Sequence, residues 1–193
     1  MTDERTTASA SAQPTLSTDR LELRPFALSD AGRVQRLAGD RQVALTTANI
    51  PHPYEDGMAE EWINKHADVW EERAGVTFAM ELRKTGEVIG AIGLRIVRQH
   101  QRAEIGYWVG RPWWSKGYAT EAAGAILAFA FEGLGLQRVY AAHVSRNPAS
   151  GRVMQKLGMS HEGRFRRHFY RWGRFDDLEY YGILRSEYFS VED

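Results

Sequence analysis

The chain of 193 residues is 43% hydrophobic, 26% charged and 11% aromatic, and it contains no cysteine. This size and composition predict one folded domain and exclude disulfides, cysteine-based metal sites and a cysteine nucleophile. The formal net charge is +0, yet residues 95–174 hold 14 Lys and Arg against 4 Asp and Glu, a net charge of +10. Such a basic block attracts an anion, and the candidates are nucleic acid, lipid headgroups and a phosphorylated cofactor.

Two features of the sequence bear on where the protein resides. No run approaches the ~18 apolar residues of a membrane span, and residues 1–5 lack the start of a secretory signal. We therefore expect a cytoplasmic protein without membrane association. Residues 1–16 are polar and show no apolar periodicity, which predicts a disordered tail ahead of a single domain over residues 17–193.

The apolar periodicity predicts a mixed α/β domain. Strands are expected over residues 21–24, 76–82, 88–97, 104–109, 139–144, 161–170 and 177–184, and helices over residues 30–39, 54–73, 117–134 and 147–158. Residues 43–53 are expected to form a loop. The strands between residues 76 and 109 should pair antiparallel, whereas the helix that follows them should make a parallel crossover to the next strand.

The passage from the strand at 104–109 into the following helix has the features of an anion-binding loop. A helix begins with unpaired backbone N–H groups and the positive end of its dipole. Gly117 and Ala119 leave this backbone open to a phosphate, and Lys116 adds a positive charge. Small residues also occur at helix starts for structural reasons alone, so the pattern leaves open both an anion-binding loop and an ordinary helix start.

Residues 114–119, Trp-Ser-Lys-Gly-Tyr-Ala, resemble the pyrophosphate loop of the GCN5-related N-acetyltransferases, whose pattern is Gln/Arg-x-x-Gly-x-Gly/Ala. Trp114 departs from the first position of that pattern, as is common in the branch that resembles RimJ and RimL, the acetyltransferases of ribosomal-protein N-termini. Residues 18–25, 105–108, 147–151 and 152–158 resemble the same branch in matching order, so that the resemblance covers about residues 16–188.

The resemblance implies a twisted, mostly antiparallel sheet of about seven strands with helices on both sides. It also implies acetyl-CoA as the acetyl donor, with its pantetheine arm along the strand at 104–109, where that strand splays from the strand at 138–144. The implied cofactor-binding residues are Tyr107, Trp108, Val109, Trp114, Ser115, Lys116, Gly117, Tyr118, Ala119, Thr120, Asn147 and Ser150. Candidates to face the CoA phosphates are Arg111, Lys116, Arg146, Arg152 and Lys156.

Two residues are candidates for proton transfer. The resemblance places Ser150 near the cofactor sulfur, where it would protonate the leaving thiolate; its alternative role is that of an ordinary first-turn helix serine. Glu104 would accept a proton from the attacking amine, with Glu81 or water as the alternative base and a plain strand-edge charge as the structural interpretation. A weak base suffices for an N-terminal α-amine, whose pKa is about 7.7–8.0 against about 10.4 for Lys.

The acceptor implied by the resemblance is the N-terminal α-amine of a protein or peptide. The alternatives are a small-molecule amine of the aminoglycoside or polyamine type and a non-catalytic module that senses CoA or binds ribosomes. The expected walls of the acceptor site are residues 43–53, 54–73 and 164–176, with His52, Trp62, Tyr107 and Trp172 as substrate-binding residues. The acidic residues Glu55, Asp56, Glu60 and Glu61 are expected to attract a cationic amine.

Residues 164–174 interleave five arginines with four aromatic residues, a combination that occurs in nucleic-acid-binding segments. Strand alternation accounts for the same pattern, and we do not expect direct RNA binding. The six histidines show no metal-ligand spacing, and no metal is expected. The sequence leaves both a monomer and a homodimer open.

Overall fold

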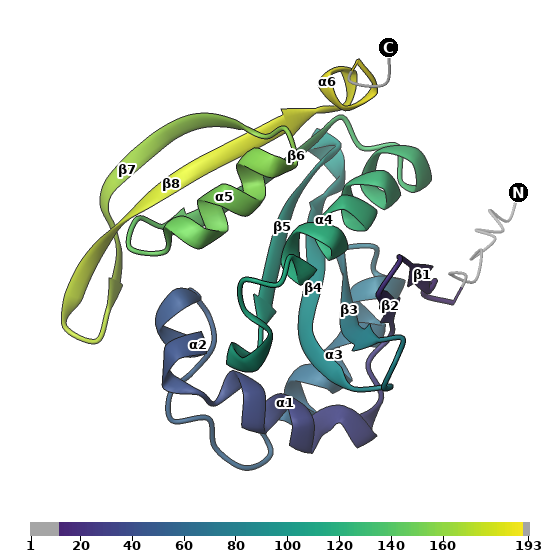
Figure 1. Ribbon diagram of the computed structural model, residues 1–193. Coiled ribbons are helices and arrows are strands. Elements are labelled where there is room, and N and C mark those ends of the chain that lie inside the picture. The colour runs from purple at the N-terminus through teal and green to yellow at the C-terminus, as the bar shows by residue number, and fades with distance from the viewer. Residues whose placement is uncertain (1–11, 191–193) are drawn as a thin grey trace, which may run out of the picture.

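An eight-stranded sheet forms the centre of the computed structural model, which describes residues 12–190 (Figure 1). The strands are β1 (Leu16–Ser17), β2 (Leu21–Arg24), β3 (Gly75–Leu82), β4 (Val88–Val97), β5 (Arg102–Val109), β6 (Arg138–Val144), β7 (Ser160–Arg171) and β8 (Arg174–Leu184). Their order is β1-β2-β3-β4-β5-β6-β8-β7, and all neighbours are antiparallel except β5 and β6. The expected α/β fold class and its parallel crossover are confirmed.

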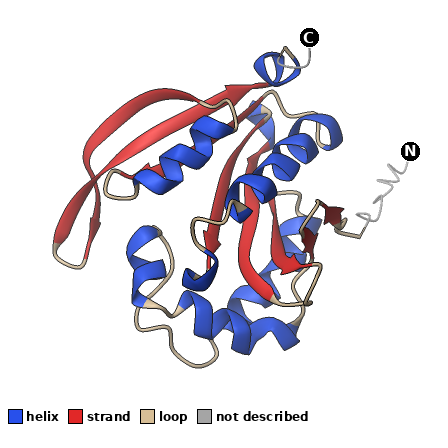
Figure 2. Cartoon of the chain, viewed as in Figure 1, coloured by secondary structure: helices blue, strands red, loops and turns tan. Residues whose placement is uncertain are grey.

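Helices cover both faces of this sheet (Figure 2). They are α1 (Ala31–Ala38), α2 (Arg41–Thr46), α3 (Met58–Glu71), α4 (Tyr118–Ala128), α5 (Pro148–Lys156) and α6 (Arg185–Phe189). Helices α1 and α3 pack against β4 and β3, whereas α4 and α5 contact each other and pack against the central strands from the opposite side. Within residues 12–190, none of the helices combines the length and the apolar composition that a membrane span requires.

Side chains from the two faces of β5 contribute to two separate hydrophobic cores. Ala103, Ile105 and Val109 are buried in the core beneath α4, while Trp108 is buried in the smaller core beneath α1 and α3. Because successive side chains of a strand point to opposite faces, Glu104 and Gly106 share the face of Trp108. Strand β5 therefore presents a different set of groups to each side of the sheet.

Strands β5 and β6 separate soon after they meet. Their parallel pairing covers only Arg102 with Arg138, Ala103 with Val139, and Glu104 with Tyr140. Beyond Glu104, the edge of β5 that faces β6 has no strand partner, so its backbone N–H and C=O groups are available to another molecule. This gap is the expected splay, and it opens beside the start of α5 (Figure 1).

Several elements differ from the sequence-based expectation. The sheet has eight strands rather than about seven because Leu16–Ser17 pairs with β2. Part of the predicted loop at 43–53 belongs to α2, which the Asp40 carboxylate caps by accepting a hydrogen bond from the Gln42 N–H at 2.7 Å. Helix α3 begins at Met58 rather than at residue 54, directly after Gly57, whose left-handed backbone has a φ of 84°.

The ends of two further predicted segments can be compared with the structure. Most of the predicted disordered tail, residues 1–11, lies outside the described residues; the Gln13 side-chain amide donates to the Thr77 carbonyl oxygen at 2.9 Å, so defined contacts begin before residue 17. The long helix predicted to end at residue 134 is α-helical only to Ala128 and continues as a π-helical turn over Phe129–Gly133.

Candidate active site

Helix α4 begins at the end of a tight loop that follows β5. Two loop residues have a left-handed backbone, Ser115 with a φ of 59° and Gly117 with a φ of 82°. Gly117 is the N-cap residue, and no side chain caps the helix. The first backbone N–H groups of α4 are therefore left without a side-chain partner, and the positive end of the helix dipole is open to an anion.

Two side chains from outside the helix hold this loop. The Trp114 indole Nε1 donates to the Val109 carbonyl oxygen at 2.6 Å, which ties the loop to the end of β5. Arg20 donates through Nη1 to the Lys116 carbonyl oxygen at 3.0 Å and forms an ion pair with Glu121, with Nε and Oε2 2.6 Å apart. The contribution of Arg20 escapes sequence reasoning because it comes from the turn between β1 and β2, far away in the chain.

The start of α5 carries two polar side chains that face the gap between β5 and β6. Asn147 caps the helix as expected, because its Oδ1 accepts a hydrogen bond from the Ser150 N–H at 3.4 Å. Its Nδ2 donates to the Thr46 carbonyl oxygen at 3.2 Å and so connects α5 to α2. The Ser150 Oγ lies 2.7 Å from the Tyr107 hydroxyl, whose pKa is raised by burial to about 12.

A cavity of about 1230 Å³ passes through this gap and reaches both sides of the sheet. Most of the residues expected to bind a cofactor line it: Tyr107, Trp108, Val109, Trp114, Ser115, Gly117, Tyr118, Ala119, Thr120, Asn147 and Ser150. Lys116 lies between the lining residues Ser115 and Gly117 in the sequence, but it does not itself line the cavity. Of the five cationic candidates, Arg152 and Lys156 contribute to the lining.

Glu104 is the single Asp or Glu among the described residues that line the cavity. Its carboxylate forms an ion pair with Arg95 from the neighbouring strand, which fixes its position. Burial, and then the negative charge of Glu104, raise the pKa of Tyr180, so these two side chains lie close together. Glu104 thus stands on the α1–α3 side of the sheet, opposite the face that carries Tyr107 and Ser150.

The alternative base, Glu81, has a different environment. Its Oε2 lies 2.7 Å from Nε of Arg24, and the same guanidinium reaches the Asp30 carboxylate at 2.8 Å. This network ties β3 to β2 and to the start of α1, and Glu81 does not line the cavity. Its position therefore argues for a structural role and against proton transfer.

The cavity on the α1–α3 side has mainly apolar and aromatic walls, to which Ile50, Tyr54, Trp62, Val69, Phe169, Leu178 and Tyr180 contribute. A methyl group placed on Gly106 would meet nothing within 4 Å, so this glycine faces open space. Glu55, Asp56, Glu60 and Glu61, which we expected to attract a cationic amine, do not line the cavity. All four are exposed; Glu60 and Glu61 lie on α3, whereas Glu55 and Asp56 precede it.

His52 and Trp172, two of the expected substrate-binding residues, do not line the cavity but contact each other, with ring centroids 6.2 Å apart. Next to them, the Arg171 guanidinium donates to the carbonyl oxygens of Ala44 (3.1 Å), Thr47 (2.8 Å), Ala48 (3.1 Å) and Ile50. This clamp fastens the tip of the β7–β8 hairpin to the end of α2 (Figure 1). No local sequence signal distinguishes Arg171 from the other arginines of the hairpin.

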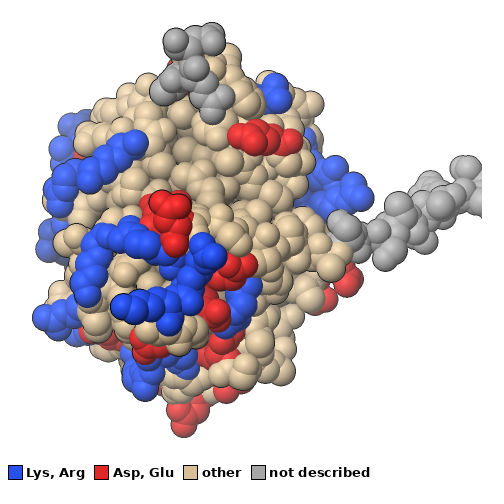
Figure 3. All heavy atoms as spheres, turned by 45° about the vertical axis from the view of Figure 1, so that its right-hand side comes forward, with Lys and Arg blue, Asp and Glu red and all other residues tan. Residues whose placement is uncertain are grey.

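Ion pairs with described residues engage five of the fourteen basic side chains of residues 95–174, namely Arg95, Arg138, Arg146, Arg164 and Arg174. Arg146 pairs with Asp176 at 3.0 Å and Arg164 with Asp177, so that acids of β8 offset arginines that precede it in the chain. On the face in Figure 3, basic and acidic side chains lie next to one another. Within the described part of the chain, no three His, Asp or Glu side chains are grouped closely enough to hold a metal ion.

Comparisons with known proteins agree with this geometry. A family model described as an acetyltransferase (GNAT) domain matches residues 20–160. The N-acetyltransferase YoaA of Bacillus subtilis is 32% identical over 89% of this chain and 97% of its own length. YdaF of the same organism, named provisionally as a ribosomal N-acetyltransferase, is 32% identical over 70% of this chain and 71% of its own length.

Solved structures agree with the family match. The crystal structure of spermidine N-acetyltransferase from Vibrio cholerae, in complex with CoA and spermine, superimposes with a TM-score of 0.78 at 26% identity. The match covers 89% of this chain and 99% of that chain.

Proposed function

The chain belongs to the family of GNAT acetyltransferases, and we propose that it transfers the acetyl group of acetyl-CoA to the N-terminal α-amine of a protein or peptide. Its class as an N-acetyltransferase that uses acetyl-CoA follows from the family. The choice of acceptor is our proposal, and one observation carries it: the cavity has a single carboxylate, that of Glu104, among mainly apolar and neutral walls.

The residues on the α4–α5 side fit acetyl-CoA. The uncapped start of α4, with Gly117 in a left-handed conformation, suits a pyrophosphate, and Arg152 and Lys156 add positive charge to the cavity wall. The free edge of β5 beyond Glu104 offers N–H and C=O groups to the amides of the pantetheine arm. Acetyl-CoA supplies an acetyl group activated as a thioester, which the amine can attack without an acyl-enzyme.

Glu104 is proposed as the base that accepts a proton from the attacking amine. It stands on the side of the sheet opposite Ser150, so base and acid flank the gap between β5 and β6. Because an α-amine has a pKa of about 7.7–8.0, a substantial fraction is already neutral near pH 7.5, and a carboxylate acting directly or through water suffices. The Arg95 ion pair holds this carboxylate in place.

Ser150 is proposed as the acid that protonates the leaving sulfur, with Tyr107 as its partner. Their hydroxyl oxygens lie 2.7 Å apart. A proton given up by Ser150 can be replaced from the Tyr107 phenol, which must then take a proton back from solvent, because burial raises its pKa to about 12 and disfavours a lasting phenolate. Of the backbone donors at 107–110, the Gly110 N–H is already bonded to the Ile89 carbonyl oxygen at 2.7 Å, and the Trp108 N–H faces β4 on the same edge of the strand. The N–H groups of Tyr107 and Val109 face the gap and are left to stabilise negative charge on the acetyl oxygen.

A polyamine is the second candidate acceptor, and the fold likeness to a spermidine N-acetyltransferase favours it. A polyamine carries several positive charges along its length, and several carboxylates would be needed to compensate them. The cavity offers one carboxylate, which Arg95 already neutralises. The walls therefore suit a single amine attached to a neutral or apolar body better than a polycation.

Release of free thiol from acetyl-CoA tests this choice. The panel holds short peptides with a free N-terminus, the same peptides with a formylated N-terminus, and spermidine. We expect thiol release with the free peptides and none above background with the formylated ones. Release with spermidine but not with any free peptide would contradict the proposed acceptor and favour the second candidate.

A further inference from the structure

A wide bulge interrupts the pairing of β7 with β8. Phe165 pairs with Leu178 and Phe169 with Asp176, so three residues of β7 stand opposite the single residue Asp177. The middle residue of the three, Arg167, has a left-handed backbone with a φ of 50°, and its N–H donates to Asp177 Oδ1 at 2.6 Å. Bulges of this kind redirect side chains and are frequent beside active sites.

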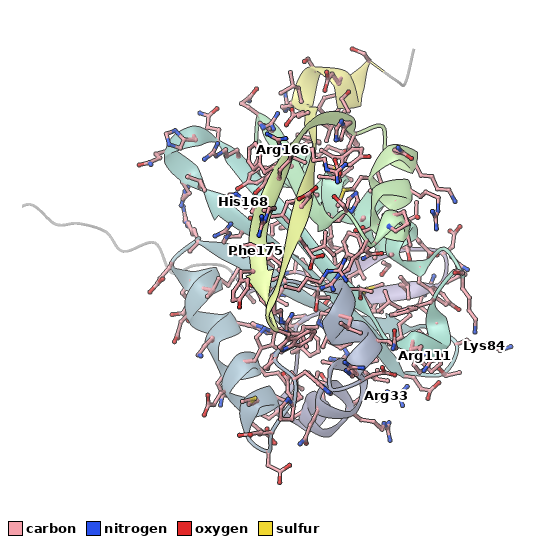
Figure 4. The ribbon with its side chains drawn as sticks, turned by 90° about the vertical axis from the view of Figure 1, so that its left-hand side faces the viewer. Arg33, Lys84, Arg111, Arg166, His168 and Phe175 are labelled. Carbon is pink, nitrogen blue, oxygen red and sulfur yellow. The ribbon has the colours of Figure 1, made fainter. Side chains whose placement is uncertain are left out.

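The three residues of this bulge are Arg166, Arg167 and His168, and all three are exposed. Arg166 has no ion pair with any described residue, and the Arg167 guanidinium lies 4.7 Å from the ring centroid of Phe175. Figure 4 shows Arg166, His168 and Phe175 along one hairpin, apart from Arg33, Lys84 and Arg111. Neither guanidinium forms an ion pair with a described residue, although the charge of Arg166, after the Arg167 N–H and Arg164, helps to lower the pKa of Asp177. The bulge therefore presents two guanidinium groups without a salt-bridge partner in the described part of the chain.

The other arginines of the hairpin are engaged. Arg164 pairs with Asp177, Arg171 is bound to backbone carbonyls, and Arg174 pairs with Asp176 at 3.2 Å. Two available guanidinium groups match one anionic group, whereas binding to a nucleic-acid backbone usually draws on many more cations. The charge of the bulge thus fits a small anionic feature on a ligand.

A series of aromatic side chains connects the bulge to the proposed base. His168 lines the cavity and also a second depression on the hairpin, whose other lining residues are Arg164, Phe165, Arg166, Arg167 and Asp177. The Phe165 ring centroid is 5.2 Å from that of His168 and 4.6 Å from that of Tyr180. Tyr180 lies beside Glu104, whose charge contributes to raising the pKa of the phenol.

From this arrangement we infer that the bulge is an acceptor subsite, in which Arg166 and Arg167 bind an acidic side chain of the polypeptide whose α-amine enters the cavity. The subsite serves the acceptor of the proposed function and therefore rests on it. Along β8, Asp177 lies three residues from Tyr180, roughly 10 Å at about 3.3 Å per residue. An extended peptide covers that distance in about three residues, so the acidic side chain should stand near position 4.

Steady-state acetylation of three matched decapeptides tests this inference. They share one neutral sequence and carry Ser, Asp or Lys at position 4. With the wild-type protein we expect KM for the Asp peptide to be about fivefold lower than for the Ser peptide, the size of a favourable exposed charge pair. The Lys peptide should have a higher KM than the Ser peptide, and added salt should reduce both differences.

The double variant Arg166→Gln/Arg167→Gln should remove the preference for the Asp peptide and leave the Ser peptide unchanged. Arg73→Gln/Arg98→Gln is the matched control, because it also removes two exposed positive charges, from the α3–β3 and β4–β5 connections at the opposite end of the sheet from the hairpin tip. It should keep the preference. Unchanged affinity for acetyl-CoA shows that the double variant is folded.

Each contrary outcome has a distinct meaning. If the wild-type protein acetylates the three peptides with equal KM, or if the double variant slows all of them equally, the subsite is wrong while the proposed function stands. If no peptide is acetylated and spermidine is, the proposed function fails and the subsite fails with it. Binding of an RNA oligonucleotide that depends on Arg166 and Arg167, without any effect on peptide kinetics, would assign the bulge to another ligand.

Discussion

The hydroxyl oxygens of Tyr107 and Ser150 lie 2.7 Å apart and connect β5 to the first turn of α5 inside the cavity. Either hydroxyl can donate to the other, and burial keeps the Tyr107 phenol protonated by raising its pKa to about 12. The two side chains therefore form one hydrogen-bonded unit next to the unpaired edge of β5.

Substitution of this pair tests its role in proton transfer. Ser150→Ala should lower kcat by about tenfold, because a thiolate is a fair leaving group and needs only a weak acid. Tyr107→Phe should have a smaller effect of the same kind, since it removes the second donor but leaves Ser150. Calorimetry should give an unchanged affinity for acetyl-CoA in both variants. Wild-type turnover for Ser150→Ala between pH 6 and 9 would make Ser150 a structural residue only.

Gly117→Val tests the loop at the start of α4. The left-handed backbone at this position disfavours a side chain, and the strain should displace the uncapped N–H groups. We expect the affinity for acetyl-CoA to fall at least ~tenfold, about 1.4 kcal/mol. Gly86→Val is the matched control, because Gly86 also has a positive φ, of 69°, in the turn between β3 and β4. Equal affinities of the two variants would remove the loop from the cofactor site.

Gly106→Val tests the side from which the acceptor enters. Its β-carbon would point into open space on the α1–α3 side, so the strand should accept valine while the cavity narrows. We expect a rise of about tenfold in the acceptor KM, comparable to misfitting one or two methyl groups in a pocket, and an unchanged affinity for acetyl-CoA. The reverse pattern, with weakened acetyl-CoA and an unaffected acceptor, would mean that the two substrates lie on the opposite sides.

His66 should make the protein sensitive to acid. Its ring packs against Trp62 and Phe26, with centroids 4.4 Å and 5.6 Å away, and neither ring nitrogen has a partner among the described residues. Burial lowers its pKa from 6.5 to about 4, so between these values the unfolded chain binds more protons than the folded one. The contribution of the neutral His66 ring to the free energy of unfolding is therefore full above pH 6.5 and is lost as the pH falls toward 4.

The variant His66→Phe isolates this effect, because phenylalanine fills the same aromatic cluster and does not titrate. Urea unfolding at several pH values should show that wild-type stability falls by about 1–2 kcal/mol more than that of the variant between pH 6.5 and 4, allowing for the partial exposure of the ring. The carboxylates paired with arginine, such as Asp30, are common to both proteins and cancel. Parallel curves for the two proteins would contradict a neutral, buried His66.

Much of the fold can be predicted from the sequence, because its helices and strands depend on local sequence patterns. The start of α4 at Gly117 and the start of α5 at Asn147 follow from helix-end preferences. The meander β3–β5 follows from alternation and from the turn at residues 84–87. These elements already fix the gap between β5 and β6, so most of the residues expected at the cofactor side do line the cavity.

The acceptor side is less predictable because long-range contacts form it. The clamp by Arg171 joins residues more than 120 positions apart, and nothing near Arg171 in the sequence marks it. The acids of α3 look suited to a cation in the sequence, but they are exposed and do not line the cavity, whereas Trp62 and Val69 of the same helix do. The three-residue bulge on β7 depends on a hydrogen bond to Asp177 from across the hairpin.

The position of the acetyl group on a mixed substrate tests the central claim most directly. A peptide with a free α-amine and one internal lysine is incubated with acetyl-CoA and an equal concentration of spermidine, and the products are identified by mass spectrometry. We predict acetylation of the α-amine, no acetylspermidine, and a loss of at least ~100-fold in rate for Glu104→Gln with acetyl-CoA binding retained. Acetyl groups found mainly on the lysine or on spermidine, or a Glu104→Gln variant as fast as the wild type, would contradict the account.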